Sequence, residues 1–106
     1  MGEKIYNKLV RDKIPDIIHK SGKECIVEQI EQEALEGFLK DKLREEVEEY
    51  IESGAIEELA DIMEVIDGIL AHRKIDIETL ESIREQKKEE RGGFLQGIKL
   101  VKTYEK

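Results

Sequence analysis

The chain has few of the residues that build disulfide-rich, sheet-rich or membrane-spanning proteins. It contains one cysteine, one proline and no tryptophan among 106 residues, and aromatic side chains make up only 5%. A single cysteine excludes an internal disulfide and a cysteine-based metal site, so we expect a reducing, cytoplasmic setting and a buried Cys25 that behaves as a small hydrophobe. No apolar run approaches the length of a membrane span or of a secretory signal.

Charge is what the sequence has in abundance. Charged residues make up 42% of the chain, and 26 acidic against 18 basic residues give a net charge of −8. This balance favours amphipathic helices over a sheet sandwich and makes broad binding to nucleic acid or to an anionic membrane improbable. It leaves room for a small phosphorylated ligand that is held through a cation.

Apolar residues recur with helical spacing, which predicts a mainly α fold in one domain over residues 1–106. We expect an antiparallel helical hairpin or bundle, assembled as a homodimer or homotetramer because so short a chain buries a modest core. A small two-stranded β appendage would pair the β-leaning segment 24–30 with residues 98–101. The predicted helices are a short one opening at Pro15, then 31–53, 55–73 and one capped by Asp76 that ends near Arg91.

Residues 43–66, LREEVEEYIESGAIEELADIMEVI, contain nine carboxylates. At about 100° per residue, Glu46 falls inside the apolar arc of the first long helix and Glu49 lies at its edge. Glu58 falls within the arc of the second helix, and Asp61 borders it. The solvent-facing acids are Glu45, Glu48, Glu52, Glu57, Glu64 and Asp67.

The four inward acids are placed symmetrically about the glycine that ends the first helix. Glu49 and Glu58 are nearly equidistant from Gly54, and so are Glu46 and Asp61, so each pair lies level across an antiparallel hairpin of one particular handedness. Uncompensated, such a group is very costly to bury. A hard divalent cation, Mg²⁺ or Mn²⁺, is one solution. Ion pairs with lysine and arginine are the other, and spacing leaves the two equally open.

Two basic groups accompany the acids. Lys8, Arg11 and Lys13 lie in the N-terminal segment, and a second group recurs at helical spacing near the end of the last helix. Arginine grips phosphate oxygens in a bidentate manner, so either group suits a phosphate ligand. The second group also fits a solvated face that offsets neighbouring glutamates. It consists of Arg84, Lys87, Lys88 and Arg91, of which Arg91 is the best phosphate candidate.

These residues resemble a known family. EEVEE at 45–49 followed by ELAD at 58–61 is similar to the E-E-x-x-E … E-x-x-D pattern of the MazG-like, all-α nucleoside triphosphate pyrophosphohydrolases. YNKLVRDKIP at 6–15 and ERGGF at 90–94 resemble a subgroup described as phosphoribosyl-ATP pyrophosphohydrolase-like. The hairpin is shorter between its acid pairs than in many MazG-like proteins, which leaves less room beside the metals.

The resemblance implies cleavage of a nucleotide between its α and β phosphorus atoms, giving a monophosphate and pyrophosphate. It implies Mg²⁺ as cofactor, with Mn²⁺ as an alternative. Carried over by motif position, the metal ligands are Glu46, Glu49, Glu58 and Asp61. We expect Glu46 or Glu49 to serve as the catalytic base. Phosphate oxygens are expected to contact Lys8, Arg11, Lys13 and Arg91.

Three functions therefore stand as hypotheses. The first is a house-cleaning pyrophosphohydrolase that acts on nucleoside triphosphates. The second is hydrolysis of phosphoribosyl-ATP in histidine synthesis. The third is a non-enzymatic helical dimerisation or binding module in which the acids form salt bridges.

Overall fold

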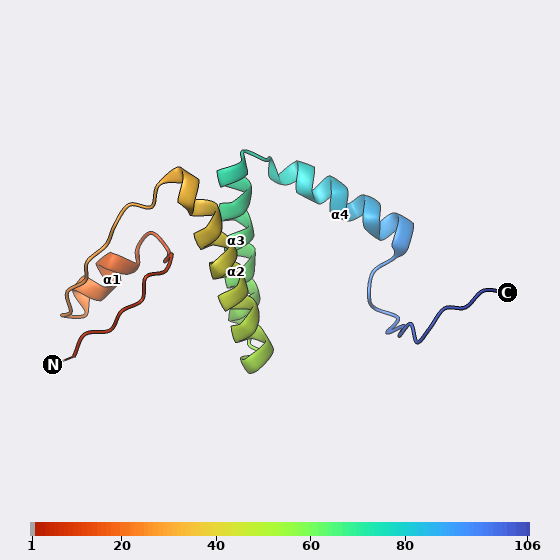
Figure 1. Cartoon of the computed structure of the whole chain (residues 1–106), viewed down its shortest axis with the longest axis horizontal. Coiled ribbons are helices and arrows are strands. Elements are labelled where there is room, and N and C mark those ends of the chain that lie inside the picture. Colours follow the sequence, from red (N-terminus) through yellow and green to blue (C-terminus); the bar gives the residue numbers. More distant parts are fainter. Residues whose placement is uncertain (1) are drawn as a thin grey trace. The chain divides into compact units, whose positions relative to one another are not determined.

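A computed structural model describes residues 2–106, and over these residues the chain is helical with no β-strand. Figure 1 shows the helices in chain order. The chain divides into two compact units, one ending at Lys74 and the other running from Ile75 to Lys106. The mainly α prediction is confirmed. The helices are α1 (Ile14–Lys20), α2 (Gln32–Ser53), α3 (Ile56–Arg73) and α4 (Ile77–Arg91).

The first unit is organised around an antiparallel hairpin of α2 and α3, which lie side by side in Figure 1. Only Gly54 and Ala55 separate the two helices. Gly54 adopts the left-handed conformation (φ 67°, ψ 11°), and its N–H donates to the carbonyl of Tyr50 at 2.7 Å. A glycine ends the helix here because this conformation carries no Cβ penalty for it. The tight reversal sets the register of every pair of residues across the hairpin.

A narrow apolar seam holds the two helices together. Leu39 of α2 and Val65 of α3 are the buried hydrophobic residues of the described chain. Gly68 lies against this seam, since a Cβ built on it would stand 3.2 Å from Leu39 Cδ2. The absence of a side chain at Gly68 therefore allows α3 to approach α2 closely.

The strands anticipated at 24–30 and 98–101 are not formed in the described residues, which have no regular structure there. A two-stranded ladder without a packing surface is marginal in water, so the β-leaning composition of these segments is not sufficient. Cys25 is exposed, and the prediction that it is buried was wrong. It lies in the irregular segment between α1 and α2, where helical periodicity does not impose an inward face. Asp76 does occupy the N-cap position of α4, although its side chain makes no capping hydrogen bond.

The hairpin also carries apolar side chains that remain exposed within its own unit. Ile51 and Met63 are 74% and 68% exposed, and Val47 and Leu59 are each 37% exposed. By helical spacing these residues fall on one flank of the hairpin, opposite the flank of Asp61. No helix of residues 2–106 combines the length and apolarity needed to cross a bilayer.

Gly37 inside α2 and Gly54 at its C-cap allow a matched test of how this helix ends. Replacing Gly54 with alanine should lower the free energy of unfolding by about 1 kcal/mol, because alanine is strained at positive φ. Replacing Gly37 with alanine should raise it by a similar amount, about 1 kcal/mol, because Gly37 is inside the helix. A Cβ at Gly37 would meet no atom within 4 Å. Urea denaturation followed by circular dichroism measures both.

Glycine-to-alanine substitution is thus expected to change the free energy of unfolding in opposite directions at the two positions. If both variants shift the midpoint in one direction, the assignment of Gly54 as the left-handed cap of α2 is incorrect.

Candidate functional site

Three carboxylates converge at the interface of the hairpin. Oxygens of Glu46 from α2 and of Glu58 and Asp61 from α3 all lie within 4.8 Å of one another. The sequence predicted this convergence for one handedness of the hairpin only, and the fold has that handedness. Glu58 and Asp61 share a face because they are three residues apart on one helix. The antiparallel register brings Glu46 opposite them.

Two of these carboxylates lack partners for one oxygen each. Glu46 is only 6% exposed, and it is the one buried charged residue of the described chain. Neither Oε2 of Glu46 nor Oε2 of Glu58 has a hydrogen-bond partner, although both atoms are buried. A buried carboxylate oxygen without a partner is costly, so this arrangement favours binding of a cation or protonation.

The pKa values respond to this crowding. Burial, reinforced by the charge of Glu49, raises the pKa of Glu46 above its ordinary value. Burial and the neighbouring Glu49 raise the pKa of Glu58 from 4.5 to about 7. Glu58 lies in the first turn of α3, where the helix dipole favours a negative charge, yet desolvation and like charges outweigh that effect.

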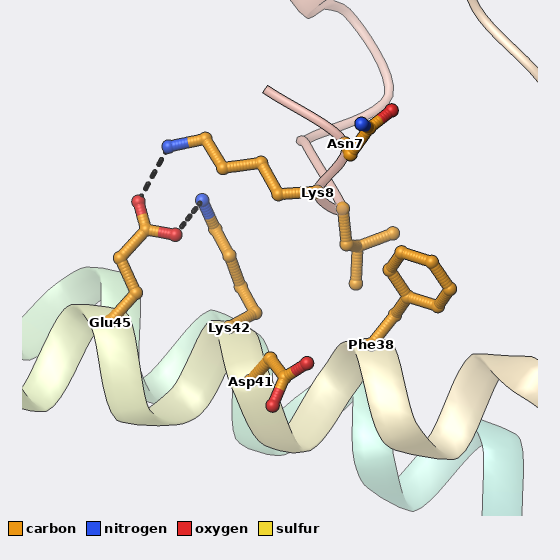
Figure 2. Close-up of a pocket in the computed structure, with 7 residues that line it drawn as sticks. Asn7, Lys8, Phe38, Asp41, Lys42 and Glu45 are labelled. Carbon is orange, nitrogen blue, oxygen red and sulfur yellow. Dashed lines mark hydrogen bonds and ion pairs between the residues drawn. The ribbon is translucent and has the colours of Figure 1, made fainter. Parts of the chain in front are cut away.

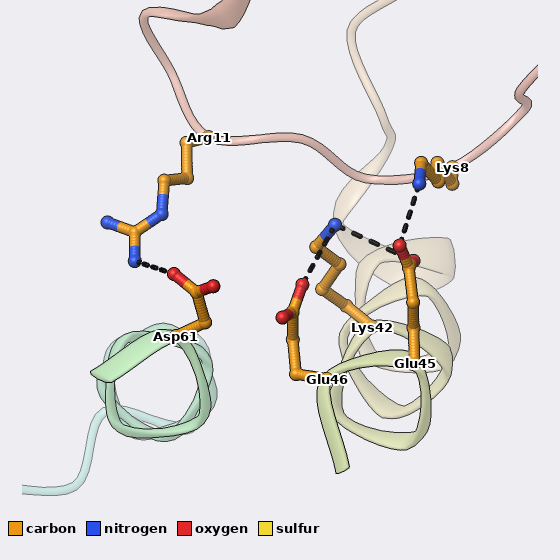
Figure 3. Close-up of polar contacts among 6 residues, drawn as sticks. All are labelled: Lys8, Arg11, Lys42, Glu45, Glu46 and Asp61. Carbon is orange, nitrogen blue, oxygen red and sulfur yellow. Dashed lines mark hydrogen bonds and ion pairs between the residues drawn. The ribbon is translucent and has the colours of Figure 1, made fainter. Parts of the chain in front are cut away.

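The N-terminal segment, residues 2–13, brings two cations to the acids. The guanidinium of Arg11 donates from Nη2 to Oδ1 of Asp61 at 2.7 Å, and Lys8 Nζ donates to Oε1 of Glu45 at 2.7 Å. Figure 3 shows the segment crossing above both helices, with Arg11 reaching α3 and Lys8 reaching α2. The chain is turned by Asn7, which has a positive φ of 46°. Thus one short segment neutralises acids on two different helices.

Lys42 is a third cation at the site, and the sequence analysis did not select it. Its Nζ lies 3.4 Å from Oε1 of Glu46 and 3.6 Å from Oε2 of Glu45. Figure 2 shows Lys8 and Lys42 both directed at Glu45. The spacing of three and four residues from Glu45 and Glu46 was a usable signal, because such pairs meet on a helix face. Lys42 also lowers the pKa of Glu45, after the larger effect of the hydrogen bond from Lys8.

A cavity of about 270 Å³ opens beside the carboxylates. The cations Arg11 and Lys42 line it together with apolar side chains and four acids, Asp12, Glu46, Asp61 and Glu64. Its size suits a phosphate chain better than a whole nucleotide, since pockets that enclose larger ligands run from about 300 to 1,000 Å³. A second, smaller space of about 100 Å³ lies between Lys8, Phe38 and Glu45, as Figure 2 shows.

Three residues selected from the sequence lie outside the converging group. Glu49 is exposed, although its charge acts on Glu46 and Glu58. Lys13 is exposed at the N-cap of α1. Arg91 is the last residue of α4 in the second unit. The roles assigned to these three residues stay predictions.

The donor set fits a hard divalent cation. All three converging groups offer carboxylate oxygen, which Mg²⁺ and Mn²⁺ prefer. Adjacent ligands of an octahedral Mg²⁺ lie about 2.9 Å apart and opposite ligands about 4.1 Å, so these three oxygens, within 4.8 Å of one another, would draw together to share an ion. The orphaned Oε2 atoms of Glu46 and Glu58 supply ligand positions that no protein donor occupies.

Comparisons of the chain with protein-family models, with curated proteins and with solved structures find no match. The function of this site therefore has to be argued from its own carboxylates, cations and cavity, and from the motif spacing of residues 45–61.

Without divalent ions, stability should depend on the protonation of Glu58. Its pKa is raised from 4.5 to about 7, so between these values the folded chain binds more protons than the unfolded chain. The free energy of unfolding should therefore fall as pH rises from about 4.5 to 7. Replacing Glu58 with glutamine should remove most of this slope. Urea midpoints measured across that range in EDTA test the effect.

Glu57→Gln is the matched control, because it changes the same charge at the neighbouring, exposed position. It should keep the wild-type slope. A Glu58→Gln variant whose stability still falls with pH as in the wild type would contradict the assignment.

Proposed function

We propose that this protein is a Mg²⁺-dependent nucleotide pyrophosphohydrolase, which converts a nucleoside triphosphate to a monophosphate and pyrophosphate. One observation carries the proposal: a buried carboxylate, Glu46, has an oxygen without a hydrogen-bond partner, and its carboxylate lies within 4.8 Å of oxygens of Glu58 and Asp61. The cations beside them suit a phosphate chain. The motif resemblance to MazG-like enzymes supports the α–β cleavage position and a cytoplasmic house-cleaning role.

Glu46, Glu58 and Asp61 would hold the cation. A bound divalent ion supplies Lewis acidity to the α-phosphate and lowers the pKa of a water. Ionised carboxylates are required for this, so the raised pKa values of Glu46 and Glu58 must drop as the ion binds.

Glu49 is the best candidate for the catalytic base. It is exposed and lies outside the converging group of three, so its carboxylate is left to orient a water and accept its proton. Glu46 is the alternative, but its buried carboxylate already faces Lys42 on one oxygen. The base therefore sits at the rim of the acid cluster, where water has access.

The cations of the N-terminal segment would bind phosphate oxygens and stabilise charge that develops on the leaving pyrophosphate. Arg11 lines the same cavity as the carboxylates, and Lys8 lies on its flank at Glu45. Lys13 at the N-cap of α1 extends this proposed set, whereas Arg91 lies in the second unit and its role stays a prediction from the sequence. Arg11 is best placed because its guanidinium already lies beside a proposed metal ligand.

The protein would act as a homodimer or a higher homo-oligomer. The flank of the hairpin that bears Ile51 and Met63 exposes apolar side chains, whereas the opposite flank carries the acids and the N-terminal segment. Packing this flank against a second copy would add to a core that otherwise buries only Leu39 and Val65 among its hydrophobic residues.

A non-enzymatic binding module is the rival function, and the ion pairs favour it. Lys8, Arg11 and Lys42 neutralise Glu45, Asp61 and Glu46 without any metal. These pairs leave the buried oxygens of Glu46 and Glu58 without partners, which a purely structural network would be expected to satisfy. The enzymatic function is therefore preferred.

Turnover should require a divalent cation and the converging acids. A panel of canonical and modified nucleoside triphosphates, with phosphoribosyl-ATP included, is assayed for pyrophosphate with Mg²⁺ and with EDTA. Glu58→Gln and Asp61→Asn should each lower kcat at least about a hundredfold, because each removes a metal ligand. Cleavage of phosphoribosyl-ATP alone would select the histidine-synthesis alternative.

Glu57→Gln serves again as the charge-matched control and should retain turnover. Circular dichroism should show unchanged helicity in all three variants. Wild-type protein that releases no pyrophosphate from any substrate on the panel would favour the binding module.

The assembly is tested by placing a charge on the exposed flank. Met63→Lys should reduce the mass measured by sedimentation equilibrium to that of a monomer, because a buried, unpaired charge is costly at an interface. Glu64→Lys, at the adjacent position, is the control and should keep the wild-type mass. A wild-type chain that sediments as a monomer refutes the assembly.

A further inference from the structure

The three cations at the site contact carboxylates that the proposed function assigns to metal and its surroundings. Arg11 donates to Asp61 at 2.7 Å, and Lys42 lies 3.4 Å from Glu46. Both cations also line the cavity of about 270 Å³ that the carboxylates face. In Figure 3, Arg11 lies above α3 and contacts Asp61, whereas Lys42 extends from α2 toward Glu46. When a divalent ion binds the carboxylates, Arg11 and Lys42 either move away or remain beside the ion.

Electrostatics decides between these outcomes for Arg11. A guanidinium and a doubly charged ion on one carboxylate repel each other at short range. The ion pair that would hold Arg11 in place is worth little, because its two side chains are 53% and 36% exposed. Water screens both forces alike, and the charge of +2 on the ion outweighs the single negative charge of Asp61 that retains the guanidinium.

The Arg11 side chain can leave Asp61 without disturbing the hairpin, because it is 53% exposed. Residues 2–13 belong to no helix, but Leu9 and Val10 are half-buried and line the cavity with Leu39, so the guanidinium would swing while the backbone of the segment stays in place. Lys42 on α2 has less freedom, since its side chain is only 16% exposed. A displaced Arg11 still faces the cavity, where a phosphate chain would supply new acceptors for its N–H groups.

We infer that Arg11 is an exchangeable counterion: it occupies Asp61 in the ion-free protein, leaves it when a divalent cation binds, and then binds a phosphoryl group in the adjacent cavity. This inference rests on the metal site of the proposed function. Arg11 would then be available to bind phosphate only after a divalent cation has displaced it from Asp61. By linkage, a phosphoryl ligand that engages Arg11 also strengthens metal binding, because it removes a competitor for Asp61.

The test measures binding rather than turnover. Mn²⁺ is titrated into wild-type protein and Arg11→Gln at low ionic strength, with free Mn²⁺ followed by its electron paramagnetic resonance signal. Arg11→Gln should bind Mn²⁺ more tightly, by about twofold to fivefold, because the competing ion pair is gone. The same two proteins are then titrated with inorganic pyrophosphate as its Mg²⁺ complex, and here Arg11→Gln should bind more weakly.

The opposite signs of the two effects are the signature of exchange, since a merely structural role for Arg11 would weaken both. Arg44→Gln is the matched control: it breaks an exposed arginine–aspartate pair, Arg44 with Asp41 at 3.1 Å, on the same helix as Glu46. It should leave both affinities within error of the wild type.

Three results overturn the inference. Unchanged or weaker Mn²⁺ binding in Arg11→Gln means that Arg11 does not compete for Asp61, while the metal site itself stands if Glu58→Gln abolishes Mn²⁺ binding. Unchanged pyrophosphate binding means that released Arg11 does not contact phosphate. Wild-type protein that binds no Mn²⁺ removes the metal site of the proposed function together with the exchange.

Discussion

The mutual repulsion of acids in the α2–α3 interface is the constraint on which the site depends. Glu46 is only 6% exposed and lies beside the apolar seam of Leu39 and Val65. Glu58 and Asp61 face it from α3 because a two-residue turn fixes the register. Packing thus forces together charges that would otherwise separate, and the energy of that arrangement is relieved by protons, by lysine and arginine, or by a divalent ion.

These three ways of reducing the repulsion are coupled because they act on one cluster of carboxylates. A proton on Glu58, an ion pair from Arg11 to Asp61 and a metal shared by both acids all reduce one cluster of negative charge. Each therefore lowers the affinity of the cluster for the other two. The raised pKa values and the close ion pairs are the ways in which protons and protein cations balance the charge of this cluster.

The N-terminal segment has a role that its composition alone does not show. It lacks regular structure before α1, yet Lys8 and Arg11 place charge on both helices of the hairpin. Leu9 and Val10 are half-buried beside these ion pairs, so apolar contacts as well as charges hold the segment against the hairpin.

The sequence by itself determined the helices and the inward faces of the acids. Apolar spacing and Gly54 predicted α2 and α3 to within a residue at each end, since helical periodicity and a left-handed glycine are local properties. Helical spacing also selected Glu46, Glu58 and Asp61, which converge, and Glu49, which is exposed and lies outside the group. Segments 24–30 and 98–101 were predicted as strands and are not, because strand formation depends on a partner and a packing surface.

Only the tertiary structure decided the handedness of the hairpin, and with it whether the acids meet or diverge. It also decided that Arg11 reaches Asp61 across 50 residues of sequence. The physical reason is the same in each case. Which side of a helix pair a distant segment covers depends on the packing of the whole unit, whereas the direction of a side chain on a helix depends only on its neighbours in sequence.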